Sequence, residues 1–353
     1  MKIVFYIDQL FNGGAERVTA ILASEFSNKP NCEVYVVALN EGILYQLDEK
    51  VKYVVIKQTQ LKKPWKIFFR LYHSIKVIRK INPDVIYSLG YMGQYISMAR
   101  ILKMIGARVI VSERTNPYLE PSKKINVLVR NYLYGKSDCI VCQTPQAEDY
   151  YKKRLKTRTC VIPNPIMPNL PSWKGENSLD IVCACRLAKQ KNIPMLIRAF
   201  KKVHAIYPQF KLKIYGQGEL KEELQSMIDK LGLSKCATLE GQTNKLHDIL
   251  ASSFMSVLSS DYEGISNTMI ESLGIGVPTL CTDCPMGGAA MFIKDGVNGL
   301  LSPVGNIDEF ANKMIYLIEH QEQLDGISKN AKKINLILEQ GAIAQKWYEL
   351  AQG

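Results

Sequence analysis

Residues 179–216 read LDIVCACRLAKQKNIPMLIRAFKKVHAIYPQFKLKIYG and contain one complete strand-helix-strand unit. The apolar run at residues 179–185 predicts a buried strand, and KLKIYG at residues 211–216 predicts a second one. Between them, residues 193–207 carry apolar side chains at the spacing of one helix face. This rhythm is typical of a parallel sheet covered by helices.

The same alternation extends from this unit toward both ends of the chain. It begins with KIVFYI at residues 2–7 and breaks at residues 161–178, where VIPNPIMPNLPSWKGENS is rich in proline and polar residues. Such a break indicates an interdomain linker, and 353 residues exceed the usual size of one core. The sequence predicts two α/β domains, residues 1–167 and 168–335, followed by a terminal helix at 336–353. Ligands in such sheets bind beyond the carboxyl ends of the strands, so we expect a site in a cleft between the domains.

Composition is that of an ordinary globular protein, with 47% apolar and 22% charged residues. No uncharged apolar run reaches the length of about 18 residues that predicts a transmembrane helix, and the N-terminus resembles a strand rather than a signal peptide. We therefore expect a cytoplasmic protein.

The nine cysteines lie mostly in apolar runs and are expected to be reduced. The pairs Cys139/Cys142 and Cys281/Cys284 have zinc-ligand spacing, but the first lies in a predicted strand, so zinc is not favoured.

Positive charge is concentrated in the first half of the chain. The net charge is +12, yet residues 1–167 hold 26 Lys and Arg against 13 Asp and Glu, and the remainder holds 19 against 20. This asymmetry indicates an anionic surface that meets one domain only. Nucleic acid is not favoured, because no recognised binding motif accompanies the charge.

Residues 61–81, LKKPWKIFFRLYHSIKVIRKI, combine seven basic residues with several aromatic ones and contain no acid. An ordinary helix packed on the sheet explains the apolar periodicity but not the missing acids. A basic helix with aromatic side chains suits contact with an anionic membrane. The predicted membrane contacts are Lys62, Lys63, Trp65, Lys66, Phe69, Arg70, Arg79 and Lys80.

Two loops at strand ends carry groups suited to phosphate. CRLAKQKN places Arg186 and Lys191 just beyond a strand, where a guanidinium fork and an ammonium group can bind a diphosphate. Gly13 and Gly14 separate the first strand from the first helix, where backbone can approach an anion closely. A solvated basic loop and a plain tight turn explain these residues equally well when each is taken alone. The chain has no Asp-x-Asp triplet, so no metal-bridging carboxylate pair is expected.

Two glutamates bracket the start of a predicted helix in SSDYEGISNTMIESLGIGVPTLCTD, residues 259–283. Gly264 frees the backbone after Glu263, so successive N–H groups can form an anion-binding nest at the helix N-terminus. The Glu263 carboxylate can accept hydrogen bonds from sugar hydroxyls, and Glu271 from ribose hydroxyls. For any such pair, a surface glutamate and a helical glutamate are the ordinary explanation.

Four segments, taken in order and spacing, resemble family 4 glycosyltransferases of the GT-B fold: CRLAKQKNIPMLIRAF, YGQGEL, EGISNTMIESLGIGVPTLCTD and DGVNGLLSPVGN. The family's Glu-x7-Glu motif matches at Glu263 and Glu271, and the opening GGAER loop matches as well. The resemblance implies two Rossmann-like domains that face a central cleft. It assigns residues 1–167 to the acceptor and 168–335 to the nucleotide sugar, and it sends the C-terminal helix back to the first domain.

The resemblance also assigns roles to residues. It implies that Arg186 and Lys191 bind the donor diphosphate, that Glu271 binds ribose, and that Glu263 holds the sugar. The implied donor-binding set is Gly13, Gly14, Arg186, Lys191, Gly216, Gly218, Glu263, Gly264, Ile265, Ser266, Asn267 and Glu271. Catalytic roles are implied for Glu263, Arg186 and Lys191, and in the loop SERTNP for Glu113 and Arg114. Two departures stand out, since many relatives have His at the position of Arg114 and Glu at that of Met291.

The implied activity is that of a retaining glycosyltransferase that needs neither metal nor cofactor. It would move a hexose or N-acetylhexosamine from a nucleotide sugar, expected to be a UDP-sugar, to a hydroxyl of a lipid-linked glycan. SERTNP resembles a subgroup that builds bacterial surface polysaccharides, which places the reaction in capsule, exopolysaccharide or O-antigen assembly at the inner face of the cell membrane. A non-catalytic GT-B partner subunit, motivated by Arg114, is the alternative, and a sugar phosphorylase or epimerase is a third hypothesis.

Overall fold

The computed structural model describes residues 1–353 apart from 12, 44, 57–64, 91–92 and 102. The chain divides into two compact units. Unit 1 comprises Met1–Pro165 and Gln340–Gly353, and unit 2 comprises Ile166–Glu339.

Unit 1 is built on a seven-stranded parallel sheet with the order β3-β2-β1-β4-β5-β6-β7. Its central strands are buried along nearly their whole length, which explains why they appear in the sequence as apolar runs rather than alternating patterns. The strands are β1 (Lys2–Ile7), β2 (Glu33–Ala38), β3 (Lys52–Val55), β4 (Val85–Leu89), β5 (Arg108–Glu113), β6 (Cys139–Cys142) and β7 (Arg158–Val161).

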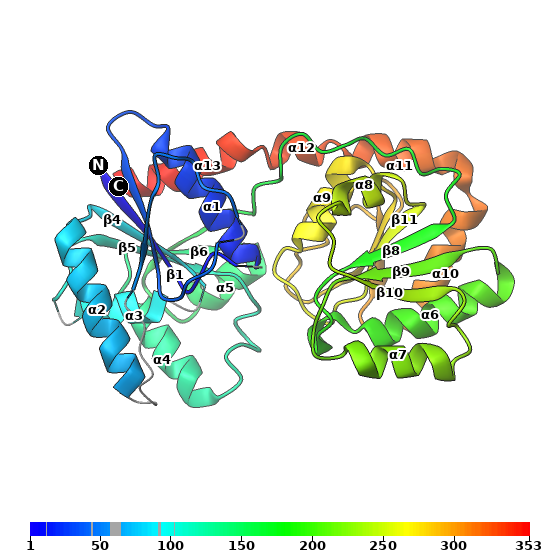
Figure 1. Ribbon diagram of the computed structural model, residues 1–353, viewed down its shortest axis with the longest axis horizontal. Helices are drawn as coiled ribbons and strands as arrows, with labels where there is room; N and C mark the ends of the chain where they lie inside the picture. The colour runs from blue at the N-terminus through cyan, green and yellow to red at the C-terminus, as the bar shows by residue number, and fades with distance from the viewer. Residues whose placement is uncertain (12, 44, 57–64, 91–92, 102) are drawn as a thin grey trace. The chain divides into compact units, whose positions relative to one another are not determined.

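Helices cover both faces of this sheet (Figure 1). On one face, α1 (Gly14–Ser27) packs against α13 (Gln340–Gln352). On the other, α3 (Gly93–Ile101) lies between α2 (Trp65–Ile81) and α4 (Lys124–Tyr134) and contacts both. The short α5 (Pro145–Lys152) connects β6 to β7 and is capped by Thr144, whose hydroxyl accepts a hydrogen bond from Ala147 N at 3.2 Å.

The terminal helix α13 is an integral part of unit 1. Trp347 is fully buried, and its carbonyl oxygen accepts a hydrogen bond from the Tyr87 hydroxyl at 2.6 Å. The Tyr348 ring meets the Phe26 ring edge-on with centroids 5.4 Å apart. The predicted return of the C-terminal helix to the first domain is therefore confirmed.

Replacing Trp347 by Ala is expected to destabilise unit 1 by about 3–5 kcal/mol, because a large side chain is removed from a core that cannot fully collapse around the cavity. Urea unfolding followed by circular dichroism measures the change. Leu336→Ala is the matched control, since Leu336 is 84% exposed on α12 (Ile334–Ile337) and its loss should change stability by no more than about 0.5 kcal/mol. Equal midpoints for the two variants would contradict a core role for Trp347.

Unit 2 has a six-stranded parallel sheet with the order β10-β9-β8-β11-β12-β13. Its strands are β8 (Asp180–Ala184), β9 (Lys211–Tyr215), β10 (Ala237–Gly241), β11 (Met255–Leu258), β12 (Thr279–Asp283) and β13 (Leu300–Pro303). Besides α12, its α-helices are α6 (Ile193–Ile206), α7 (Lys221–Lys230), α8 (Leu246–Ala251), α9 (Asn267–Ile275), α10 (Ile307–Glu319) and α11 (Leu324–Ala331). Neighbouring β8 and β11 pair directly, so the loops that leave their carboxyl ends meet at one edge of the sheet.

Helix α2 carries most of the predicted membrane contacts. Lys62 and Lys63 lie outside the described residues. Trp65 is 69% exposed, and Lys80 is exposed as well, whereas Lys66, Phe69 and Arg70 are half-buried. Two cations make internal contacts: Arg70 Nη2 donates to Asn40 Oδ1 at 2.8 Å, and Arg79 Nε donates to Met104 O at 2.9 Å. None of the helices in the described parts of the chain is long and apolar enough to cross a membrane.

Candidate functional site

Two loops at the carboxyl edge of the unit 2 sheet are held together by backbone and side-chain hydrogen bonds. Asp261 N donates to Gln190 O at 2.9 Å, and Ser259 Oγ donates to Lys191 O at 2.9 Å. Asn192 adopts a left-handed conformation with φ of 41°, and its Nδ2 donates to Asp261 Oδ1 at 2.6 Å. These contacts fix the loop after β8 against the loop after β11.

The ion pair of Lys191 and Glu263 is the centre of this arrangement. Lys191 Nζ donates to Glu263 Oε1, which also accepts from Ser260 Oγ at 2.9 Å, while Gln190 Nε2 lies 3.4 Å from Oε2. The two charged side chains are only 15% and 17% exposed. Burial alone would lower the pKa of Lys191, but the charge and hydrogen bond of Glu263 outweigh it and raise that pKa. Lys191 therefore stays cationic at neutral pH, and the Glu263 carboxylate has a defined direction.

Arg186 lies on the same loop and differs from Lys191 in its surroundings. Its side chain is exposed, and its guanidinium has no hydrogen-bond or ion-pair partner among the residues that the structure describes. An unpaired fork of N–H donors beside a second cation can bind two phosphate groups.

Gly216 and Gly218 bring the loop after β9 into close contact with the Arg186 loop. A Cβ at Gly216 would lie 1.9 Å from Cys185 O, and the φ of Gly216 is +135°. A Cβ at Gly218 would lie 2.2 Å from Leu187 O, and Leu187 N donates to Gln217 O at 2.9 Å. Both glycines are thus needed to support the backbone around Arg186, which is a reason for their presence that the sequence alone does not reveal.

Helix α9 begins directly after the Glu263 loop. Its N-cap is Ser266, whose hydroxyl accepts from Met269 N at 3.4 Å. Gly288 lies against this loop so closely that a Cβ there would come within 1.6 Å of Gly264 O. The Glu263 loop therefore leads directly into the N-terminus of α9, where the helix dipole favours anions.

Glu271 lies on α9 and is nearly buried, with 3% exposure. Its Oε2 is 3.1 Å from His247 Nε2 on α8. His247 was not predicted from the sequence, because nothing in its spacing connects it to Glu271. The Glu271 carboxylate and the His247 ring nitrogen thus lie side by side, an arrangement that suits hydrogen bonding to ribose hydroxyls.

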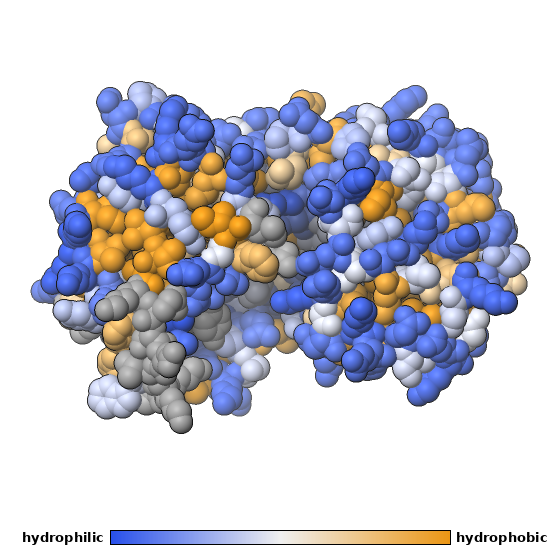
Figure 2. All heavy atoms as spheres, in the orientation of Figure 1, coloured by the Kyte–Doolittle hydropathy of each residue, from blue (hydrophilic) through white to orange (hydrophobic). Residues whose placement is uncertain are grey.

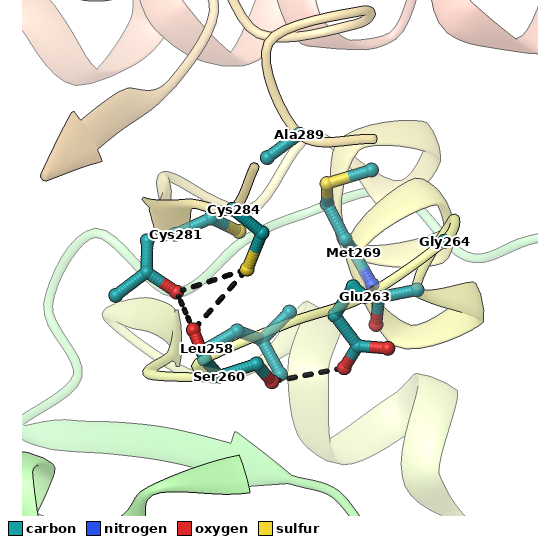
Figure 3. A pocket seen from close by; sticks show the side chains of 10 residues that line it. Leu258, Ser260, Glu263, Gly264, Met269, Cys281, Cys284 and Ala289 are labelled. Atoms are coloured by element: carbon teal, nitrogen blue, oxygen red, sulfur yellow. Dashed lines mark hydrogen bonds between the residues drawn. The ribbon is translucent and has the colours of Figure 1, made fainter. Parts of the chain in front are cut away.

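A small pocket opens between the end of β12 and the start of α9 (Figure 3). Thr282 Oγ1 and Cys284 Sγ both donate to the backbone oxygen of Ser260, at 2.6 and 3.2 Å. These bonds hold the backbone of Ser260, whose hydroxyl donates to Glu263. Burial raises the pKa of Cys281 well above its usual value and that of Cys284 to about 12, so both thiols stay protonated. The lining residues are Leu258, Ser260, Glu263, Gly264, Ser266, Met269, Cys281, Thr282, Cys284 and Ala289.

The predicted donor-binding residues of unit 2 therefore converge, since Arg186, Lys191, Glu263, Gly264, Ser266 and Glu271 lie on three adjacent segments of one sheet edge. Met291, at the position where many relatives have Glu, is 38% exposed. Within the described parts of the chain, no cluster of His, Cys, Asp or Glu has the arrangement of a metal site, and all nine cysteines are free thiols.

In unit 1, the Gly13–Gly14 turn begins α1, but a side chain already occupies it. A Cβ at Gly13 would lie 1.9 Å from Glu16 Oε2, so the Glu16 carboxylate folds back over the first turn. Burial raises the pKa of Glu16, and the nearby charge of Asp8 adds to this effect, while Arg114 opposes it. Glu16 thus occupies this helix N-terminus, a contact that its position in the sequence does not reveal.

Glu113 and Arg114 follow β5 and have different environments. Glu113 is 6% exposed and accepts from Arg114 N, Thr115 N and Thr115 Oγ1 at 2.9–3.1 Å and from the Tyr151 hydroxyl at 2.5 Å. These contacts give Glu113 a role in shaping the loop, whereas its predicted catalytic role remains a prediction.

Arg114 donates from Nη2 to Asn164 Oδ1 at 2.7 Å. Its Nε and Nη1 are buried and have no hydrogen-bond partner in the described part of the chain. Burial lowers its pKa to about 10, which leaves it cationic at neutral pH. Arg114 is thus a buried cation with two unsatisfied donor atoms, and its catalytic role stays a prediction.

Family models match nearly the whole chain. Residues 12–170 match the model described as "Glycosyltransferase Family 4", and residues 172–334 match "Glycosyl transferases group 1". An uncharacterized glycosyltransferase of Methanocaldococcus jannaschii is 33% identical over 272 residues, 70% of this chain and 64% of that protein, so the chain spans under two thirds of that relative's length.

A second relative matches along almost its full length. The N-acetylgalactosamine-N,N'-diacetylbacillosaminyl-diphospho-undecaprenol 4-alpha-N-acetylgalactosaminyltransferase of Campylobacter jejuni is 27% identical over 354 residues, 94% of each chain. Among solved structures, HepE of Anabaena in complex with UDP and glucose superimposes with a TM-score of 0.85 at 18% identity and covers 100% of this chain and 99% of HepE. This likeness confirms the predicted GT-B fold.

Proposed function

The chain belongs to the family 4, group 1 glycosyltransferases, and on that premise we propose that it moves a hexose or N-acetylhexosamine from a UDP-sugar to a hydroxyl of a lipid-linked glycan. One observation carries the proposal: Arg186 and the Lys191–Glu263 pair converge beside the N-terminus of α9. This edge of unit 2 offers two cations and a helix dipole to a diphosphate and a carboxylate to a sugar.

In the proposed reaction, the C1–O bond to the donor phosphate breaks and a bond from C1 to the acceptor oxygen forms on the same face of the sugar. Arg186, Lys191 and the start of α9 stabilise the negative charge that develops on the departing UDP. The leaving phosphate oxygen takes the proton of the acceptor hydroxyl. Glu263 accepts hydrogen bonds from the sugar hydroxyls and holds C1 in position, and Glu271 with His247 orients the ribose.

The proposed acceptor and the proposed location at the membrane are supported by two separate observations. The name of the Campylobacter relative specifies an undecaprenol diphosphate carrier for that protein, and the basic excess of residues 1–167 here suits a membrane surface. We therefore propose a role in bacterial surface-glycan assembly, such as capsule, exopolysaccharide or O-antigen, at the inner face of the cell membrane, with α2 as a contact.

The purified chain should transfer sugar from at least one of UDP-glucose, UDP-N-acetylglucosamine and UDP-N-acetylgalactosamine to a short polyprenyl-diphosphate sugar in the presence of EDTA. Mass spectrometry of the lipid and release of UDP give two independent measurements, and the anomeric configuration of the product tests retention.

Saturable UDP binding without any product in this assay would favour the second candidate, a non-catalytic partner subunit, which is motivated by Arg114 in place of the usual His. Product formation by the chain alone would end that alternative.

A further inference from the structure

Helix α4 directs its apolar side chains away from the core of unit 1. Ile125, Leu128, Val129 and Tyr132, called here the α4 stripe, are 63%, 65%, 41% and 60% exposed. Their spacing places them on one face of the helix. In a globular domain such a stripe ordinarily packs on the core, so its exposure calls for a partner.

The inward face of α4 carries Leu133 and Tyr134 together with Arg130, which is 2% exposed and fixes the rotation of the helix. Its Nη2 donates to Pro117 O at 3.0 Å and to the Tyr150 hydroxyl at 2.9 Å, and its Nη1 lies 3.7 Å from Glu113 Oε2. Rotating α4 to bury the stripe would break these charge-assisted bonds and leave the Arg130 guanidinium either exposed or buried without partners. The outward direction of the stripe is therefore built into the fold.

The helix of the stripe and two helices on the same side of the sheet carry basic residues and no acidic ones. Helices α2, α3 and α4 contain no Asp or Glu, and α3 contacts both of its neighbours. Exposed Lys123 and Lys124 precede the stripe, and Lys136 follows it with Nζ 5.5 Å from the centre of the Tyr132 ring. Apolar residues bordered by lysines and free of acids match an anionic lipid interface, where acyl chains and headgroup phosphates lie at adjacent depths.

Helix α2 adds aromatic residues to the same side of the sheet. Trp65, Phe68 and Tyr72 are 69%, 61% and 63% exposed and also follow one face of their helix. On the face drawn in Figure 2, apolar side chains of unit 1 gather in a patch next to α2. Exposed apolar residues on this helical layer are thus not confined to α4.

We propose that α4 is an interfacial membrane helix: the α4 stripe inserts among the acyl chains of an anionic bilayer, while Lys123, Lys124 and Lys136 contact the headgroups. This deepens the proposed membrane location and rests on it, but membrane binding can be tested without sugar transfer. It also differs from the predicted contact through α2, because an inserted stripe gives binding that high salt weakens but does not abolish.

Co-sedimentation with phosphatidylcholine vesicles, with and without phosphatidylglycerol, tests the proposal. The protein should bind vesicles that contain phosphatidylglycerol, and Ile125→Ser/Leu128→Ser should weaken this binding by about tenfold or more. Ile206→Ser/Ile337→Ser is the matched control, since both residues are 60% exposed in unit 2, and it should bind as the wild type does. Unchanged circular dichroism spectra and melting temperatures of both variants would show that they fold.

A tryptophan placed in the stripe reports insertion directly. Trp173 and Trp347 are buried, so Trp65→Phe combined with Tyr132→Trp leaves the α4 residue as the exposed tryptophan. Its emission should shift to the blue with phosphatidylglycerol vesicles only. No shift, or equal binding by the stripe variant and the wild type, would overturn the proposal. So would a wild-type dimer that the stripe substitutions dissociate in the absence of lipid, which would make the stripe a protein interface.

Discussion

Turnover of the Glu263→Gln variant is expected to fall by about 10²–10³-fold, the size of effect seen when one preorganised electrostatic contact to a transition state is removed. Glutamine keeps the shape of the side chain but removes the negative charge of the carboxylate, whose Oε1 accepts from both Lys191 and Ser260. The sugar would then be held less firmly, and Lys191 would lose the partner that positions it. Steady-state rates with the best UDP-sugar measure the loss.

A control is needed because breaking a partly buried ion pair also affects stability. Asp180→Asn is a suitable control, because it breaks another ion pair of unit 2. Asp180 Oδ2 on β8 lies 2.6 Å from Lys213 Nζ on β9. The turnover of this control should equal that of the wild type. If both variants lost turnover in proportion to their melting temperatures, Glu263 would have a structural role only.

The Arg186→Ala variant is expected to bind UDP about 10–100-fold more weakly than the wild type. A charge-assisted hydrogen bond to a phosphate contributes about 1.5–3 kcal/mol, and each 1.4 kcal/mol changes an affinity about tenfold. Isothermal calorimetry measures the difference. Because Arg186 is exposed and has no ion-pair or hydrogen-bond partner among the described residues, the melting temperature of the ligand-free variant should stay close to that of the wild type.

Arg198→Ala removes the same side chain from an exposed position on α6 and is the matched control. Its UDP affinity should not change measurably. Similar weakening in both variants would mean that the general charge of unit 2 attracts the nucleotide and that Arg186 makes no specific contact.

The architecture could be predicted from the sequence because strands buried on both faces of a parallel sheet are apolar throughout. KIVFYI and LDIVCA each become a strand at the predicted place, and the proline-rich segment around Asn164 contains the division at Pro165. The contacts within the site could not be predicted. Gln190 reaches Glu263 only after two loops 73 positions apart in sequence are brought together, and His247 reaches Glu271 only after α8 packs on α9.

Two helices show a further limit of periodicity. The pattern of INVLVRNYLYGKS at residues 125–137 predicts an amphipathic helix, but it does not reveal that Arg130 faces inward, because its acceptors lie on other segments. The terminal helix expected at residues 336–353 begins only at Gln340 as α13, because α12 ends at Ile337. Leu338, with φ of −110°, departs from helical geometry at the passage from unit 2 to unit 1.

A nucleotide-sugar site in unit 2 around Arg186, Lys191 and Glu263 should bind UDP without acceptor, metal or lipid. Calorimetric titration of UDP into the wild-type chain in EDTA measures this binding. We expect saturable binding to a single class of site per chain, stronger than the binding of CMP under the same conditions. No heat of binding at saturating UDP, or equal binding of both nucleotides that is abolished by moderate salt, would contradict it.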